Sequence, residues 1–267
     1  MAALSPLLNV MISASRKAAR GLARDFGEVE NLQVSVKGPS DFVSTADKKA
    51  ERTLQQELAK ARPRFGFLME EGGEIAGEDT SHRWIIDPLD GTTNFLHGIP
   101  QFAISIALER DGQVIAGVVH NPITDELYFA ERGQGAFLIA PYTERRLRVS
   151  ARAQLDLAVV ATGIPHRGRG DHPRFLGQLE RVMGAVAGVR RMGAASLDLA
   201  YVAAGRCDAY WEEALSPWDI AAGVLLVQEA GGVAMATDGS ADPMAHGNPL
   251  ATNRKLQGPM LRLLRGA

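Results

Sequence analysis

The chain begins with a helical pattern and continues into a series of strand-like segments. Apolar side chains recur at helical spacing across residues 4–22, with basic residues between them, which predicts an amphipathic helix. The polar residues 36–41 predict a loop. A second amphipathic helix is expected to open at residues 44–47 and to end near Arg62.

Short apolar segments follow, and the first two end at acidic residues. Residues 65–69 and 83–86 are typical of buried strands, and they stop directly before Glu70 and Asp87. Carboxylates at neighbouring strand ends are expected to converge. Four more segments extend a largely antiparallel sheet, namely residues 102–108, 114–120, 127–130 and 135–139.

Strands and helices alternate in the second half of the chain. Strands are expected at residues 157–162 and 209–211, and helices at residues 173–187, 196–204 and 220–229. Residues 1–145 are therefore interpreted as helices plus an antiparallel sheet, and residues 146–267 as an α/β half. With no linker between them, both halves are expected to form a single domain spanning residues 1–267.

Composition narrows the class of protein. A length of 267 residues with 46% hydrophobic content is sufficient for a large core. The formal net charge of -2 gives no overall field to attract nucleic acid or an anionic membrane, and no apolar stretch approaches the ~20 residues of a membrane span. The single cysteine, Cys207, fits a reducing compartment, so a cytoplasmic location is expected. A first segment without acids before Asp25 also resembles a mitochondrial transit peptide, but the helix runs into the domain, which favours the structural interpretation.

Candidate chemistry lies at the end of the strand at residues 83–86. Asp87 and Asp90 flank Pro88-Leu89 in a predicted turn that directs two carboxylates and a carbonyl toward one point, as magnesium prefers. Residues 91–94 add backbone amides and hydroxyls at a predicted helix start, which is an anion site. Such a string on its own is more often a solvated turn.

Two other acidic features have ordinary structural interpretations when taken singly. Asp219 begins an apolar helix, where an acid complements the helix dipole. Glu70 and Glu71 could open an exposed acidic loop.

Taken together, three motifs resemble the inositol monophosphatase family of lithium-sensitive, magnesium-dependent phosphatases. They are Glu70-Glu71, residues 84–95 and residues 218–223, in that order, and the resemblance spans nearly the whole chain. It implies a layered αβαβα sandwich of the sugar phosphatase type, with mixed and antiparallel sheets. It also implies hydrolysis of small phosphate monoesters, foremost myo-inositol 1-phosphate, to the alcohol and phosphate.

The resemblance also implies roles for individual residues. The metal ligands, for two to three Mg²⁺ ions, would be Glu70, Asp87, the Leu89 carbonyl, Asp90 and Asp219. The catalytic set would be Glu70, which positions the attacking water, a hydrogen-bonded pair of Asp47 and Thr92, and Lys37 near a third, weaker metal.

Substrate contacts are implied at Asp90, Gly91, Thr92, Gly193, Ala194, Ala195 and Glu212. A common form of the family has Thr or Ser in place of Ala194, so one hydroxyl contact with the alcohol would be missing. Fructose 1,6-bisphosphate, histidinol phosphate and 3'-phosphoadenosine 5'-phosphate are alternative substrates of related enzymes.

Partners are the least determined expectation. The resemblance implies a homodimer, and some bacterial relatives are partners of the transcription machinery. A basic face for such a partner would be made by Arg16, Lys17, Arg20 and Arg24, or by the loop at residues 166–174. The same loop, with His166 and His172, is otherwise interpreted as a solvated surface.

Overall fold

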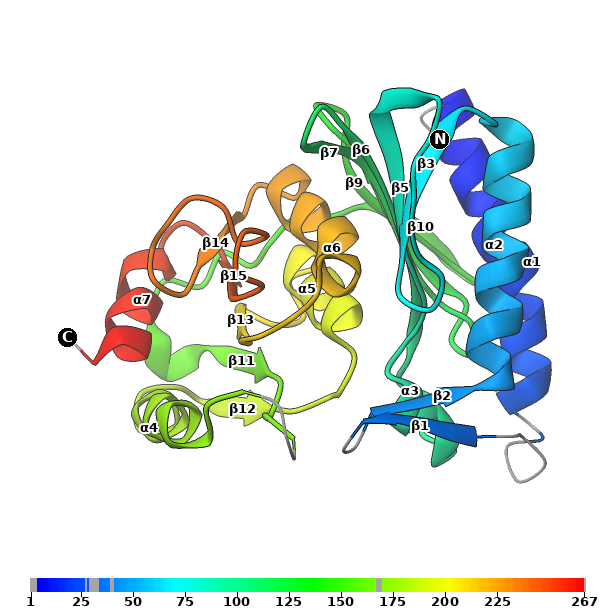
Figure 1. Cartoon of the computed structure of the whole chain (residues 1–267). Coiled ribbons are helices and arrows are strands. Elements are labelled where there is room, and N and C mark those ends of the chain that lie inside the picture. The colour runs from blue at the N-terminus through cyan, green and yellow to red at the C-terminus, as the bar shows by residue number, and fades with distance from the viewer. Residues whose placement is uncertain (1–3, 27, 29–33, 39–40, 167–169, 267) are drawn as a thin grey trace.

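The computed structural model describes residues 4–26, 28, 34–38, 41–166 and 170–266, with only the backbone described for residues 34–38 and 41–44. Figure 1 shows alternating layers: α1 with α2, an eight-stranded sheet, α5 with α6, a five-stranded sheet, and α4 with α7. The expected αβαβα sandwich is therefore confirmed. The helices are α1 (Pro6–Phe26), α2 (Thr45–Ala61), α3 (Thr92–Leu96), α4 (His172–Met183), α5 (Ala195–Ala203), α6 (Pro217–Glu229) and α7 (Gln257–Arg265).

The eight-stranded sheet has the order β10-β9-β8-β7-β6-β5-β3-β4. Its neighbours pair antiparallel except β3 and β5, which are parallel. The strands are β3 (Phe65–Met69), β4 (Gly73–Ile75), β5 (Asp79–Asp90), β6 (Ala103–Arg110), β7 (Gln113–Asn121), β8 (Glu126–Glu131), β9 (Gly135–Ala140) and β10 (Thr143–Arg146). Because helices cover both faces, β6 to β8 are nearly continuous apolar runs.

The five-stranded sheet has the order β12-β11-β13-β15-β14, with β11 parallel to both of its neighbours and β15 antiparallel to both of its own. Its strands are β11 (Val159–Thr162), β12 (Gly188–Arg190), β13 (Ala209–Trp211), β14 (Val233–Ala236) and β15 (Pro249–Thr252), preceded by a 3₁₀ turn at Leu155–Leu157. The ends of β11 and β13 lie side by side, because Thr162 pairs with Trp211.

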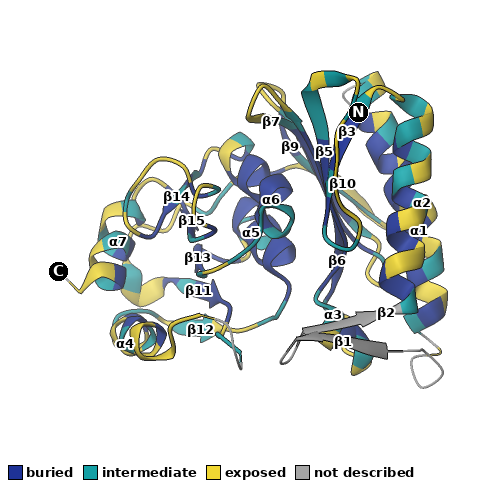
Figure 2. Ribbon diagram, viewed as in Figure 1, coloured by how far each residue is buried: buried dark blue, intermediate teal, exposed yellow. Residues whose placement is uncertain are grey.

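Burial explains the helix sequences. Figure 2 shows α5 and α6 almost wholly buried between the two sheets, whereas α1 and α2 are exposed along their outer sides. The central helices are accordingly mostly apolar around their circumference. In contrast, α1 buries one stripe that includes Leu8, Met11 and Leu22, as the predicted amphipathic pattern requires.

Some elements differ from the sequence-based expectation. The predicted loop at residues 36–41 contains parts of an antiparallel hairpin, β1 (Val34–Gly38) and β2 (Asp41–Ser44). The strands β4, β10, β12, β14 and β15 and the helix α7 were not predicted. Of these, β4 and β10 are exposed at every position and carry no apolar run that would mark a strand. Within the described ranges, no helix combines the length and apolar composition needed to cross a bilayer.

Candidate active site

The candidate metal-binding segment is the last part of β5. Pairing between β5 and β6 shifts register between Asp87 and Asp90, so the predicted turn is an irregularity inside the strand. The Leu89 amide donates to Asp87 Oδ1 at 2.8 Å, which fixes the local backbone. Such bulges redirect side chains at the ends of sheets. Both carboxylates consequently line one cavity, together with Leu89.

Gly91 connects this strand end to the short helix α3. Its φ of 94° is left-handed, and a β-carbon there would lie 3.0 Å from the Gln101 carbonyl oxygen and 3.1 Å from that of Gly193. The Thr92 hydroxyl follows, 3.2 Å from Asp47 Oδ1 and 3.1 Å from the Leu89 carbonyl oxygen. The hydrogen bond expected between Asp47 and Thr92 is therefore present.

One cavity of about 170 Å³ collects most of the predicted site residues. From the expected set it is lined by Glu70, Asp87, Leu89, Asp90, Gly91, Thr92, Gly193, Ala195, Glu212 and Asp219. Asp47 is buried and reaches the cavity through Thr92, whereas Ala194 is buried against Gly91 and is not among the lining residues. Lys37 belongs to β1, and its side chain falls outside the described residues, so its role stays a prediction.

Buried like charges dominate the metal side of the cavity. Asp87 is 2% exposed, and burial, followed by repulsion from Glu70, Asp90 and Asp219, raises its pKa well above the ordinary value. Burial also raises the pKa of Asp90 to about 7, although hydrogen bonds from Ser196 oppose the change. Those bonds reach Asp90 Oδ2 from the Ser196 amide at 2.7 Å and from its hydroxyl at 2.5 Å.

Asp219 both caps helix α6 and lines the cavity. It lies in the first turn of α6, where its Oδ2 accepts from the Ser216 amide at 2.7 Å as part of a capping box. The same residue lines the cavity and contributes to the raised pKa of Asp87. The Asp219 side chain therefore caps the helix and is at the same time a candidate metal ligand.

The donor set fits a hard divalent cation. Four carboxylates and a carbonyl supply oxygen ligands only, and their mutual repulsion is what a cation would neutralise. Among the residues that the structure describes, no three acidic, histidine or cysteine side chains form a ready-made metal cage. Magnesium keeps several waters and shares its shell with substrate phosphate, so a complete cage is not required.

The alcohol side of the cavity comes from the second half of the chain. Asn94 holds the loop before α5, with its Nδ2 donating to the Met192 carbonyl at 2.8 Å and to the Gln101 carbonyl at 2.7 Å. Glu212 follows β13, and the Tyr210 hydroxyl donates to its Oε2 at 2.6 Å.

Thr93, part of the predicted anion site, also lines the cavity, whereas sequence reasoning missed four other lining residues: Gly163, His166, Arg191 and Leu215. His166 lines the cavity, although the sequence predicts its loop to be a solvated surface or a basic face for a partner; Arg167 and Arg169 of that loop fall outside the described residues. The position of Arg191, two residues before the Gly193 motif, was the one available signal. Nothing local in the sequence marks Gly163 or Leu215.

Comparison with known proteins identifies the family of the chain. The profile of the inositol monophosphatase family matches residues 3–266. The inositol-1-monophosphatase of Rhizobium meliloti is 61% identical over 254 residues, 95% of this chain and 94% of that protein. The Nus factor SuhB of Escherichia coli is 40% identical over 262 residues, 98% of this chain and 97% of that protein. The crystal structure of extragenic suppressor protein suhB from Bartonella henselae has a TM-score of 0.94 at 56% identity, covering 98% of this chain and 99% of that chain. The chain belongs to the inositol monophosphatase family.

Proposed function

We propose that this protein, a phosphoric monoester hydrolase by family, hydrolyses myo-inositol 1-phosphate with magnesium. The observation that carries the proposal is a single cavity that joins four carboxylates to the start of α3 and to Glu212. The inositol-1-monophosphatase that is 61% identical supports this choice of substrate. Magnesium is proposed because hard oxygen ligands suit it better than the softer transition metals, and because the family that the chain resembles is magnesium-dependent.

The metal side would hold two to three ions. Glu70, Asp87, the Leu89 carbonyl, Asp90 and Asp219 are the proposed ligands. When bound, magnesium supplies neutralisation of the phosphate and leaving-group oxygens and lowers the pKa of water. Lys37 is proposed to lie near a third, weaker position.

Thr92 and Asp47 would orient the attacking water together with Glu70. Because the Thr92 hydroxyl proton points to Asp47 Oδ1 and the Leu89 carbonyl oxygen, the hydroxyl oxygen would accept a hydrogen bond from a water on the cavity side. That contact directs a water lone pair at the phosphorus. Backbone amides of Gly91 and Thr92 would hold the phosphate oxygens, since amides in the first turn of a helix lack partners within it.

The alcohol would be recognised by Asp90, Gly193, Ala195 and Glu212. Carboxylate and carbonyl oxygens accept hydrogen bonds from polyol hydroxyls, so this side favours a hydroxylated alcohol. Ala194 offers no hydroxyl and is buried, which leaves one family contact unmade.

A substrate panel tests the proposal. With magnesium, kcat/KM should be highest for myo-inositol 1-phosphate among that ester, fructose 1,6-bisphosphate, histidinol phosphate and 3'-phosphoadenosine 5'-phosphate. Asp90→Asn should nearly abolish turnover while the protein stays folded by circular dichroism. A folded Asp90→Asn enzyme with full magnesium-dependent activity would show the assignment to be wrong.

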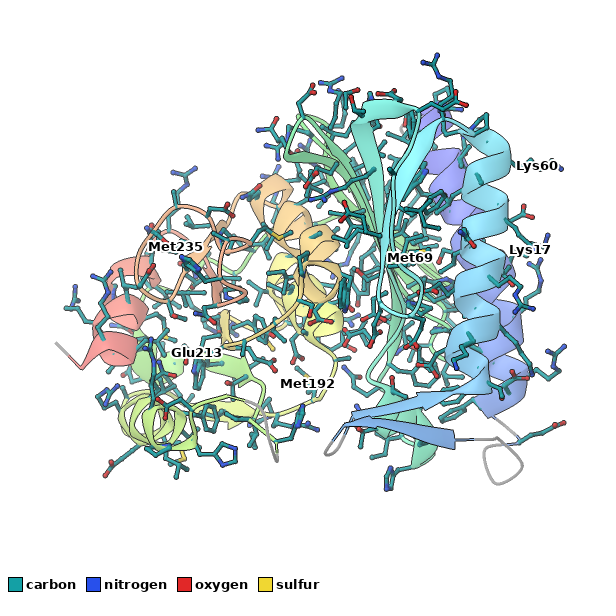
Figure 3. All side chains as sticks on the ribbon, in the orientation of Figure 1. Lys17, Lys60, Met69, Met192, Glu213 and Met235 are labelled. Carbon is teal, nitrogen blue, oxygen red and sulfur yellow. The ribbon has the colours of Figure 1, made fainter. Side chains whose placement is uncertain are left out.

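A second function, as a partner of the transcription machinery, is favoured by one comparison. The relative from Escherichia coli that is 40% identical carries the name Nus factor SuhB. Arg16, Lys17, Arg20 and Arg24 are all exposed on α1, although Lys17 pairs with Glu57 at 2.6 Å (Figure 3). Co-purification with polymerase factors that survives Asp90→Asn would support this role, and its absence at physiological salt would argue against it.

The homodimer and the cytoplasmic location stay predictions.

A further inference from the structure

Glu212, at the alcohol side of the cavity, is held from behind by a buried phenol. Tyr210 lies in the middle of β13 and is fully buried, and its hydroxyl donates to Glu212 Oε2 at 2.6 Å. Glu212 directly follows the strand, and this hydrogen bond brings the two side chains together. A short bond from a neutral donor to a carboxylate is among the stronger hydrogen bonds in proteins.

Gly163 supplies the room for that carboxylate. It directly follows β11, whose last residue, Thr162, pairs with Trp211 next to Glu212. A β-carbon at Gly163 would overlap the carboxyl carbon and both carboxyl oxygens of Glu212. Gly163 lies outside the left-handed φ range, so space alone requires glycine here. The carboxylate therefore lies against the Gly163 backbone while Tyr210 holds one of its oxygens.

The surrounding charges make this restraint necessary. Repulsion from Glu212 contributes to the raised pKa values of Asp90 and Asp198. A mobile Glu212 carboxylate would turn away from these groups. Burial and the neighbouring carboxylates raise the pKa of Tyr210 well above its usual value, so its phenol keeps the proton that it donates.

The next residue anchors the backbone on the opposite side. Glu213 Oε1 accepts from Gln178 Nε2 at 2.9 Å and from Arg174 Nε at 3.1 Å, both on α4, and Figure 3 labels Glu213 in this part of the molecule. With the main chain held there, Tyr210 and Gly163 act directly on the carboxylate of Glu212.

We propose that Tyr210 is a positioning residue for alcohol specificity, which, with Gly163, fixes the Glu212 carboxylate as an acceptor for a hydroxyl of the substrate alcohol. This inference rests on the proposed function, in which Glu212 contacts the polyol. A preoriented acceptor favours alcohols that carry hydroxyls and contributes nothing to water attack. Tyr210 itself touches neither substrate nor the reacting atoms.

The test compares two esters on the magnesium-loaded full chain. For Tyr210→Phe we expect kcat/KM for myo-inositol 1-phosphate to fall about 3- to 10-fold, mainly through KM, the effect of one hydrogen bond. For 4-nitrophenyl phosphate, whose alcohol lacks a second hydroxyl, kcat/KM should stay within about twofold. Gly163→Ala should lower the ratio of kcat/KM for myo-inositol 1-phosphate to kcat/KM for 4-nitrophenyl phosphate, called the ester ratio. If Tyr210→Phe does not fold, Gly163→Ala provides the test instead.

Tyr128 provides a matched control. It is also fully buried and donates to a glutamate two residues away, Glu126 Oε2 at 2.8 Å, but it belongs to the other sheet and is not among the cavity-lining residues. Tyr128→Phe should leave the ratio of the two esters unchanged.

A double-mutant cycle separates positioning from a general structural effect. In a Glu212→Gln background, Tyr210→Phe should lower the ester ratio by less than about twofold further, because the acceptor that it orients has already been changed. The positioning role would be wrong if Tyr210→Phe lowered kcat/KM equally for both esters. It would also be wrong if the effects of Tyr210→Phe and Glu212→Gln on the ester ratio were fully additive. If Glu212→Gln lowers the ratio but Tyr210→Phe and Gly163→Ala do not, only the positioning role is wrong. If Glu212→Gln itself leaves the ratio unchanged, the proposed contact of Glu212 is wrong, and the positioning role is wrong with it.

Discussion

The metal side and the alcohol side of the cavity are built in different ways. Most of the metal side comes from six consecutive residues, 87–92, whose shape is held by local bonds such as that from the Leu89 amide to Asp87. The alcohol side is assembled from the ends of β11 and β13 and from the loop before α5. Two of the repelling carboxylates, Asp87 and Asp90, therefore lie on a locally held segment, whereas alcohol recognition depends mainly on tertiary packing.

The two sides of the cavity therefore differ in the interactions that determine their stability. On the metal side, buried carboxylates repel one another, which destabilises the metal-free protein and is relieved by a cation. On the alcohol side, Glu212 is held by hydrogen bonding and close packing. Substitutions on the two sides should therefore change stability and activity in different combinations.

The largest expected effect is on the metal side. Asp87→Asn keeps an oxygen for the Leu89 amide but removes a buried negative charge. We expect kcat to fall roughly 100-fold or more, since metal charge stabilisation is worth several kcal/mol. The metal-free variant should melt at a higher temperature than the metal-free wild type, and magnesium should raise its Tm less.

Steady-state kinetics and thermal melts over a magnesium titration check this prediction. Glu71→Gln is the matched control, because Glu71 adjoins Glu70 but is not among the residues lining the cavity. A metal-free Asp87→Asn protein that is less stable than wild type would show that the carboxylates do not repel one another as described.

A smaller effect, on the free energy of unfolding, is expected at Gly91, where the metal side and the alcohol side meet. Alanine there must adopt a φ of 94° and place its β-carbon 3.0 Å from the Gln101 carbonyl oxygen and 3.1 Å from that of Gly193. We expect Gly91→Ala to lower the free energy of unfolding by about 2–3 kcal/mol, measured by urea denaturation. Gly112→Ala has a similar φ of 74° with nothing within 4 Å, so it should cost only the backbone strain, about 1 kcal/mol. Equal losses would mean that the two sides are not tightly packed at Gly91.

The same contrast explains what the sequence could predict. The carboxylates of the metal side follow apolar strands or begin an apolar helix, so local pattern and the family resemblance identified residues that share one cavity. Gly163 and Leu215 could not be found in this way, because their place beside Glu212 depends on the pairing of β11 with β13 and on a loop. The layered fold was predicted, but its edge strands were not, since strands such as β4 and β10 are exposed at every position and carry no apolar run.

The smallest expected effect concerns a carboxyl group buried behind the alcohol side. Asp198 is 1% exposed, and neither of its oxygens has a hydrogen-bond partner among the described residues. Burial, with repulsion from Glu212 and Asp90, raises its pKa well above the usual value. The folded protein therefore retains a proton that the unfolded chain releases above about pH 4, so the stability linked to this proton is lost as the pH rises.

Asp198→Asn removes that dependence on pH. Against wild type, the variant should gain relative stability as the pH rises from about 4 toward the raised pKa of Asp198 in the folded protein, even if the buried amide lowers its stability at the acidic end. Urea denaturation of both metal-free proteins across this range measures the difference, and the other carboxylates cancel because both proteins contain them. Parallel stability curves would contradict the prediction, because they would require Asp198 to ionise equally in the folded and unfolded chains.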